Sequence, residues 1–195
     1  YVSLFGNLAH NKNRLKSISE TLKRYNERID EFYAGYKEIA EGSKMQTIMS
    51  TIKKNEPYMK PYMKYEEGNS LTAIYGMKSI GINPADGQEI YVKRDGTLTY
   101  DWSSAEQQKV GDSEPWAQGA FGVNLRWRNF TMYTTFLYEW GGDAYNSTLI
   151  SNVENVDLNA YNADYRVVLD RWQEPGDVSP LKALKDRYNV TRPTS

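Results

Sequence analysis

The chain has 195 residues and a formal charge of −1, from 24 Lys and Arg against 25 Asp and Glu. This length allows one sizeable domain, and the charge balance gives no reason to expect nucleic acid or an anionic membrane surface as a partner. The absence of cysteine excludes disulfides and thiolate metal sites, while 16 Tyr and five Trp in a chain that is only 39% apolar indicate that aromatic residues carry much of the burial.

The first residues alternate as in a β-strand, with Val2, Leu4 and Leu8 on one face. No apolar run reaches the roughly 18 residues of a transmembrane helix, and no basic-then-apolar start predicts a signal peptide. The chain lacks a starting Met and closes on the loop-like run 191–195. We therefore expect it to be a piece of a longer protein.

The next segment changes to helical periodicity. Ser17 followed by Glu20 matches a capping box, and the helix is expected to end near Gly42. Its apolar face is formed by Ile18, Leu22, Tyr25, Ile29, Phe32, Tyr33, Tyr36 and Ile39. A second short helix is predicted from Met45, Ile48, Met49 and Ile52. These helices would either pack onto their own protein, which we favour, or offer a surface to a partner.

Short strands and tight turns follow over 68–102. Strands are predicted at 71–77, 90–92 and 97–102, with turns at 83–87 and at Asp95-Gly96, which together make a small β-ribbon. Asp86 and Asp95 beside glycines could suggest a calcium loop, but the twelve-residue spacing of acidic ligands is missing. The Asp-Gly pairs indicate turns, and we expect no metal and no cofactor.

The most informative stretch is 121–140, two alternating runs hinged at Arg128-Asn129. The apolar face of these two runs, which we predict to contact lipid, comprises Phe121, Val123, Leu125, Trp127, Phe130, Met132, Phe136, Tyr138 and Trp140. The other face holds the candidates for a channel lumen, Asn124, Arg126, Tyr133 and Glu139. A tilted strand of about 9–11 residues crosses a bilayer, so the second run is long enough and the first falls slightly short.

Aromatic residues gather at both ends of this hairpin. Trp127 and Phe130 lie at the hinge, and Tyr138 and Trp140 at the far end, where the aromatic girdles of a membrane barrel would fall. A soluble sandwich also alternates, with its apolar face turned to a core, and periodicity alone favours that interpretation. The distinction depends on the surrounding sequence.

After Gly141-Gly142 the chain enters a mixed segment of helix and loop. A helix is predicted from Tyr165, Val168, Leu169 and Trp172, ending before 175–177. The hairpin thus has a short turn at one end and long excursions at the other. This asymmetry is typical of outer-membrane barrels, whose periplasmic turns are brief and extracellular loops long.

Catalytic groups are sparse. His10 is the only histidine, and its surroundings offer no nucleophile elbow or orienting acid. No phosphate-binding glycine loop and no paired-histidine metal motif occurs. We therefore expect no enzymatic activity.

Eight groups of residues resemble, in order, the C-terminal barrel half of SusC/RagA-type TonB-linked outer-membrane proteins of Bacteroidetes. They are 7–13 (NLAHNKN), 67–70 (EGNS) with 74–76 (IYG), 81–87 (GINPADG), 93–97 (KRDGT), 111–115 (GDSEP), 119–122 (GAFG), 138–146 (YEWGGDAYN) and 171–177 (RWQEPGD). Each motif alone is weak, but their order and spacing extend over nearly the whole chain.

The resemblance implies a mainly β fold with helical loop insertions, as a fragment of a transmembrane antiparallel β-barrel with long extracellular loops. Within one barrel domain spanning 1–195, it implies a strand-linking excursion at 10–118, a transmembrane hairpin at 119–140 and an extracellular loop region at 141–195. The family imports glycans or peptides across the outer membrane with a SusD-like surface lipoprotein, powered by TonB through parts outside this sequence. The alternative from the residues is a soluble, aromatic-rich carbohydrate-binding module, in which Trp and Tyr stack on sugar rings.

Overall fold

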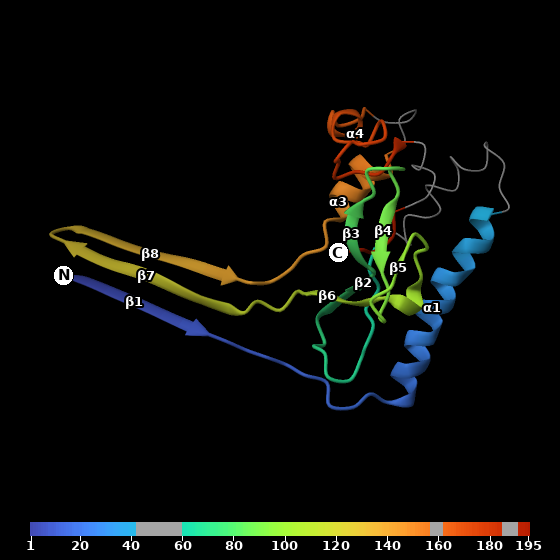
Figure 1. The fold of residues 1–195 in the computed structure, drawn as a ribbon. Coiled ribbons are helices and arrows are strands. Elements are labelled where there is room, and N and C mark those ends of the chain that lie inside the picture. Colours follow the sequence, from blue (N-terminus) through green and yellow to red (C-terminus); the bar gives the residue numbers. More distant parts are fainter. Residues whose placement is uncertain (42–59, 157–161, 185–190) are drawn as a thin grey trace.

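The computed structural model describes residues 1–41, 60–156, 162–184 and 191–195 of the chain. Figure 1 shows a three-stranded sheet projecting as a long arm from a body that contains all the other elements. The elements, in chain order, are β1 (Val2–Ala9), α1 (Glu20–Glu41), β2 (Ala73–Gly76), β3 (Lys78–Ile82), β4 (Glu89–Val92), β5 (Leu98–Thr99), η2 (Ser104–Glu106), β6 (Gln108–Asp112), β7 (Ala117–Trp127), β8 (Phe130–Trp140), α3 (Ser147–Leu149), η3 (Ile150–Glu154) and α4 (Arg166–Leu169).

The arm is an open antiparallel sheet in the order β1-β7-β8. β7 and β8 are joined by the two-residue turn Arg128-Asn129, so Trp127 pairs with Phe130 at one end and Ala117 with Trp140 at the other. β1 pairs with β7 from Val2 opposite Leu125. Both hairpin strands have 11 residues. The expectation that the first run falls short was therefore wrong, because β7 extends back to Ala117.

The body is built from two long excursions that leave the same end of the arm. One joins β1 to β7 and the other follows β8 (Figure 1). They meet through backbone hydrogen bonds from Asp143 N to Asp112 O (2.8 Å) and from Ala183 N to Gly87 O (2.9 Å). Two small open sheets lie within the body, β2-β6 and β3-β4-β5.

The cap of helix α1 lies two residues later than predicted. The hydroxyl of Ser19 accepts from Leu22 N at 3.4 Å, so Ser19, rather than Ser17, caps the helix. Among the side chains of its apolar face that the structure describes, Ile29 and Tyr33 are buried. The predicted helix over 45–52 lies outside the described residues.

The predicted β-ribbon forms with different limits. The turn at 83–87 is confirmed, with Gly87 N donating to Asn83 O (2.8 Å) and Gly87 at a φ of 73°. β2 is shorter than the predicted strand 71–77, and β5 keeps only two residues of 97–102. β3 and β6 were not predicted as separate strands. Asp95 accepts from both the backbone and the hydroxyl of Thr97, which is a turn role.

The predicted helical face near the C-terminus was wrong. α4 has only four residues, and it buries Val167 while Tyr165, Val168 and Leu169 are exposed. Val167 packs in a cluster with Val153, Val156 and Leu181, and Leu149 covers part of it. A single helical turn has no extended face, so tertiary contacts select the buried position.

The guanidinium of Arg171 is buried behind this cluster. It donates to the carbonyls of Val167 (2.9 Å), Lys182 (3.2 Å), Val153 (2.6 Å) and Glu154 (2.8 Å). One side chain thereby satisfies backbone acceptors from three segments, which buried carbonyls require.

Candidate functional site

One face of the arm is apolar along its whole length. The register places all nine predicted hairpin residues on it, because Phe121 pairs with Phe136 and Leu125 with Met132 in the same alternation. β1 adds its predicted side chains to the same face, since Val2 lies opposite Leu125 and Leu4 opposite Val123. The apolar surface therefore continues across all three strands.

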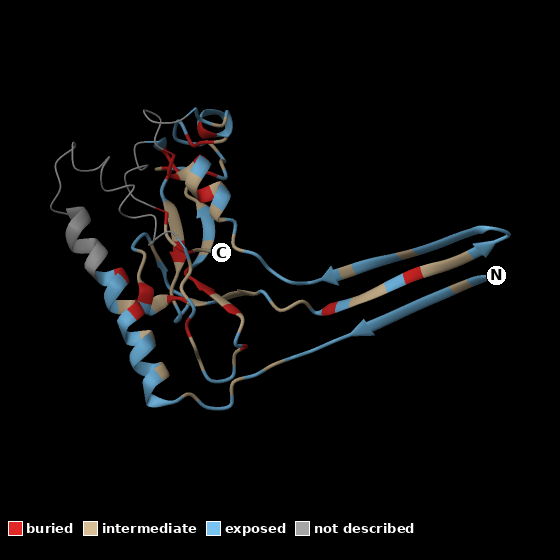
Figure 2. Cartoon of the chain, turned by 180° about the vertical axis from the view of Figure 1, so that it is seen from behind, coloured by how far each residue is buried: buried red, intermediate tan, exposed pale blue. Residues whose placement is uncertain are grey.

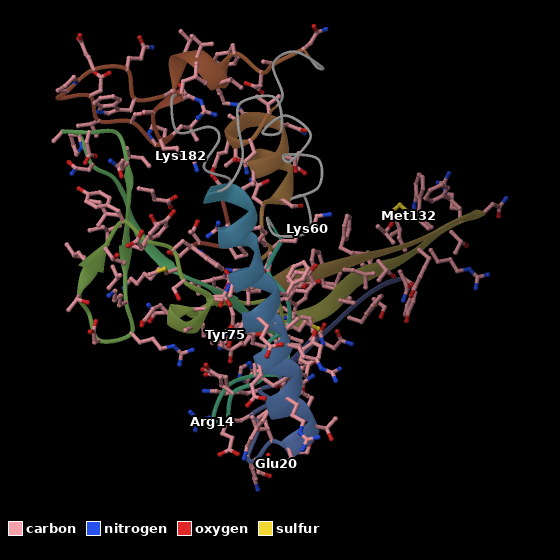
Figure 3. The ribbon with its side chains drawn as sticks, turned by 90° about the vertical axis from the view of Figure 1, so that its right-hand side faces the viewer. Arg14, Glu20, Lys60, Tyr75, Met132 and Lys182 are labelled. Atoms are coloured by element: carbon pink, nitrogen blue, oxygen red, sulfur yellow. The ribbon has the colours of Figure 1, made fainter. Side chains whose placement is uncertain are left out.

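Within the described residues, no second layer of the chain covers this face. Six of its nine hairpin side chains keep between 39% (Met132) and 72% (Trp140) of their surface exposed, and Val123, Leu125 and Tyr138 are partly buried between them. Figure 2 shows the arm mostly exposed while the buried residues gather in the body, and Figure 3 labels Met132 near the outer part of the arm. A soluble sandwich would enclose such a face, whereas the part of the chain that the structure describes leaves it open.

Cross-strand contacts order the apolar face. Phe121 stacks on Phe136 with ring centroids 5.2 Å apart. The hydroxyl of Tyr138 reaches across Gly119 of β7 and donates to the Asn7 carbonyl of β1 at 2.8 Å. A Cβ on Gly119 would lie 2.2 Å from that carbonyl oxygen and 2.7 Å from the Tyr138 hydroxyl. Glycine at 119 is thus a requirement of close strand packing.

Aromatic side chains lie at both ends of the arm. At the turn, Trp127 pairs with Phe130, and the Arg128 guanidinium lies 5.2 Å from the centre of the Trp127 ring. At the body end, Trp140 meets Trp116 edge-to-face at 5.8 Å, and Trp116 lies 5.3 Å from the His10 ring. Trp116 was missed by sequence analysis because it lies just outside the alternating run.

The opposite face carries the four lumen candidates, since Asn124 pairs with Tyr133 and Gln118 with Glu139. This face is not uniformly polar. Phe5 of β1 stacks on Tyr133 at 6.1 Å, and a Cβ on Gly122 would collide with the Phe5 ring at 2.5 Å. Leu137 also lies on this side and is 84% exposed. Both faces therefore carry apolar side chains. The first face carries more of them, and the opposite face also carries Asn124, Arg126 and Glu139.

Hydrogen bonds tie the arm to the body where the chain crosses between them. Asn13 donates to the Glu114 carboxylate at 2.6 Å, and Asp112 N donates to the Asp143 carboxylate at 2.9 Å. Burial acts to raise the pKa of Asp112, but hydrogen bonds from Lys109, from the Thr72 hydroxyl and from a backbone N–H outweigh it and hold the pKa at about 2. Asp112 is therefore a charged acceptor at neutral pH.

Several residues of the motifs that resemble SusC/RagA-type proteins hold separate segments of the body together. The Trp172 indole donates to Pro84 O at 2.8 Å, and its ring covers Gly87, where a Cβ would lie 2.5 Å away. Gly176 N also donates to Pro84 O, at 2.8 Å. The segments 81–87 and 171–177, far apart in sequence, thus pack as one unit.

No helix among the described residues has the length and apolar character needed to cross a lipid bilayer. In the same part of the chain, no group of three or more His, Asp or Glu side chains could hold a metal ion.

The comparisons with known proteins give a likeness to solved structures alone. No family model matches this chain, and no curated protein matches it. Among solved structures it is similar to a chain of the "Structure of the RagAB peptide transporter", with a TM-score of 0.50 and 19% sequence identity. The match covers 71% of this chain and 16% of that one. At this identity the likeness concerns the fold alone, so the chain resembles a section of a much longer transporter chain.

Proposed function

We propose that this chain is a wall-and-loop section of a SusC/RagA-type importer in the outer membrane. The arm is part of the antiparallel wall of a transmembrane barrel, and the body is the extracellular structure formed by two of its loops. The nine apolar residues of the hairpin contact lipid, and Asn124, Arg126, Tyr133 and Glu139 face the lumen. The role is transport rather than catalysis.

The observation that carries this proposal is the uncovered apolar face of the arm. β7 and β8 would each span about 37 Å if fully extended, or about 28 Å along the membrane normal at the usual tilt of barrel strands. That length matches the apolar band of about 25 Å on outer-membrane barrels. The long connections also lie at one end and the two-residue turn at the other (Figure 1).

The remaining assignments follow from the family resemblance. A SusD-like lipoprotein would cap the extracellular side, oligosaccharides or peptides would pass through, and TonB would act through other parts of the parent protein. The structural neighbour is by its title a peptide transporter.

Thr134 and Thr135 provide a matched pair for testing the proposal. They are the same residue type at the middle of β8, and they lie on opposite faces because Thr134 pairs with Val123 and Thr135 with Gly122. The chain has no cysteine, so Thr134→Cys and Thr135→Cys each give this section a single thiol. We expect a water-soluble, membrane-impermeant maleimide to label Thr135→Cys in the outer membrane and to leave Thr134→Cys unlabelled.

Denaturation in detergent should then make both thiols reactive, which controls for intrinsic reactivity. Equal labelling of the two thiols before denaturation would contradict the proposal. So would a soluble, monomeric preparation of the parent protein obtained without detergent.

A further inference from the structure

The residue at the turn of the arm is unusual for its backbone conformation. Arg128 has a φ of 52°, and it is the one residue other than glycine with a positive φ among the described residues. Two-residue hairpin turns normally place Gly, Asn or Asp at such positions. Arginine cannot compensate as Asn and Asp do, by a short side chain that bonds its own backbone. Turn geometry therefore does not explain why arginine occupies position 128. Asn129, a residue type that such turns favour, is the next residue, but the positive φ is at Arg128.

The side chain of Arg128 is held at the rim of the apolar face. Its guanidinium lies 5.2 Å from the centre of the Trp127 ring, and Trp127 belongs to that face and is 64% exposed. None of the ion pairs between described residues includes Arg128 or Arg126. Glu139 is the arm's single acidic residue, and it lies at the opposite end. The turn end therefore carries two arginine cations and no carboxylate. The charge of −1 is a sum over the whole chain and does not show this local excess of positive charge.

The chemistry of this arrangement matches a phosphate at a membrane surface. Aromatic residues at the ends of barrel strands sit at the level of the lipid headgroups. A guanidinium binds phosphate through two parallel hydrogen bonds, and stacking on an aromatic ring holds it ready for that contact. We propose that Arg128, positioned by Trp127, binds the phosphate of a phospholipid headgroup in the leaflet at the turn end. This inference rests on the proposed membrane-spanning role of the arm.

The test uses the parent protein purified in detergent, with phosphatidylglycerol as the probe and native mass spectrometry to measure the bound lipid. Arg128→Gly removes the charge and suits the left-handed backbone, so the turn should remain intact. We expect this variant to bind phosphatidylglycerol about fivefold more weakly. Arg128→Lys should retain part of the affinity, because it keeps the charge without the planar fork. Lys12→Gly, which removes an exposed cation at the body end, should change nothing.

Two further measurements separate the possible outcomes. Excess inorganic phosphate should not displace the lipid, since the acyl chains hold the headgroup against the apolar face; displacement would mean a site for free phosphate and would overturn the inference. Membrane insertion of each variant is followed in parallel by heat-dependent gel mobility. If the wild-type protein fails to insert, the proposed function fails. If all variants insert and Arg128→Gly binds lipid as the wild type does, only the role of Arg128 is refuted.

Discussion

Replacing Phe136 by Arg tests which side of the arm meets lipid. Phe136 lies near the middle of β8 on the apolar face, stacked on Phe121 at 5.2 Å. Arginine on the lipid side of a barrel costs about 2–4 kcal/mol at the bilayer midplane. The variant also loses about 1.5–3 kcal/mol of Phe burial and about 0.5–1.5 kcal/mol of aromatic pairing. The expected total, about 4–8.5 kcal/mol, is comparable to the whole stability of many domains.

Leu137→Arg is the matched control. Leu137 is the next residue of β8, points to the opposite face and is 84% exposed. We expect this variant to assemble with a change within about 0.5 kcal/mol, as for most surface substitutions. The assay is the amount of parent protein in the outer-membrane fraction, with heat-dependent gel mobility as the measure of folding. Normal assembly of Phe136→Arg, or a greater defect in Leu137→Arg, would refute the assignment of the faces.

Three further predictions concern packing and charge in the parent protein. Gly119→Ala should lower the free energy of unfolding by about 1–3 kcal/mol, because its Cβ would lie 2.2 Å from the Asn7 carbonyl oxygen of β1. Gly6→Ala should be close to neutral, because its Cβ would lie 3.7 Å from its nearest neighbour, the Cβ of Phe121. Arg171→Met should lower the unfolding free energy by about 3–5 kcal/mol, since four backbone carbonyls, three of them in buried hydrogen bonds, lose their donor. Arg166→Met, which breaks one partly exposed ion pair, should cost no more than about 1 kcal/mol, and equal effects of the two substitutions would contradict this prediction. The pKa of Asp112 is about 2 in the folded protein against an ordinary 3.8, so its stabilising contribution is complete above about pH 4 and is lost as the pH falls toward 2. Asp112→Asn should remove that part of the dependence of the unfolding free energy on acid pH. An unchanged acid profile in this variant would count against the prediction.

The arm could be predicted from the sequence because its information is local. A period of two assigns each residue of 121–140 to a face, and the register keeps those assignments. The same alternation places position 122 on the face where the Phe5 ring packs, and a Cβ at that position would collide with the ring. The joining of β1 to this hairpin could not be predicted, since it pairs segments separated by more than a hundred residues.

The body shows where local patterns stop being sufficient. Tyr165, Val168 and Leu169 have helical spacing, yet Val167 is the residue that becomes buried. Its partners, Val153 and Leu181, come from separate segments. The spacing of apolar residues within 165–172 therefore carries no information about these contacts. Trp116 was missed for a related reason, because its contact with Trp140 depends on where the chain leaves the sheet and not on strand alternation.

In the proposed transporter, the junction between arm and body would connect the barrel wall to its loops. The chain crosses this junction three times, before β7, after β1 and after β8, and the crossings are bonded to one another. Asn13 donates to Glu114 at 2.6 Å, and Asp112 and Asp143 exchange hydrogen bonds of 2.8 and 2.9 Å. A spanning sheet must satisfy its backbone by pairing, because lipid offers no hydrogen bonds. The body therefore fixes the strand ends relative to one another. In the proposed transporter, a movement of the loops on binding a ligand would be transmitted directly to the spacing of the wall strands.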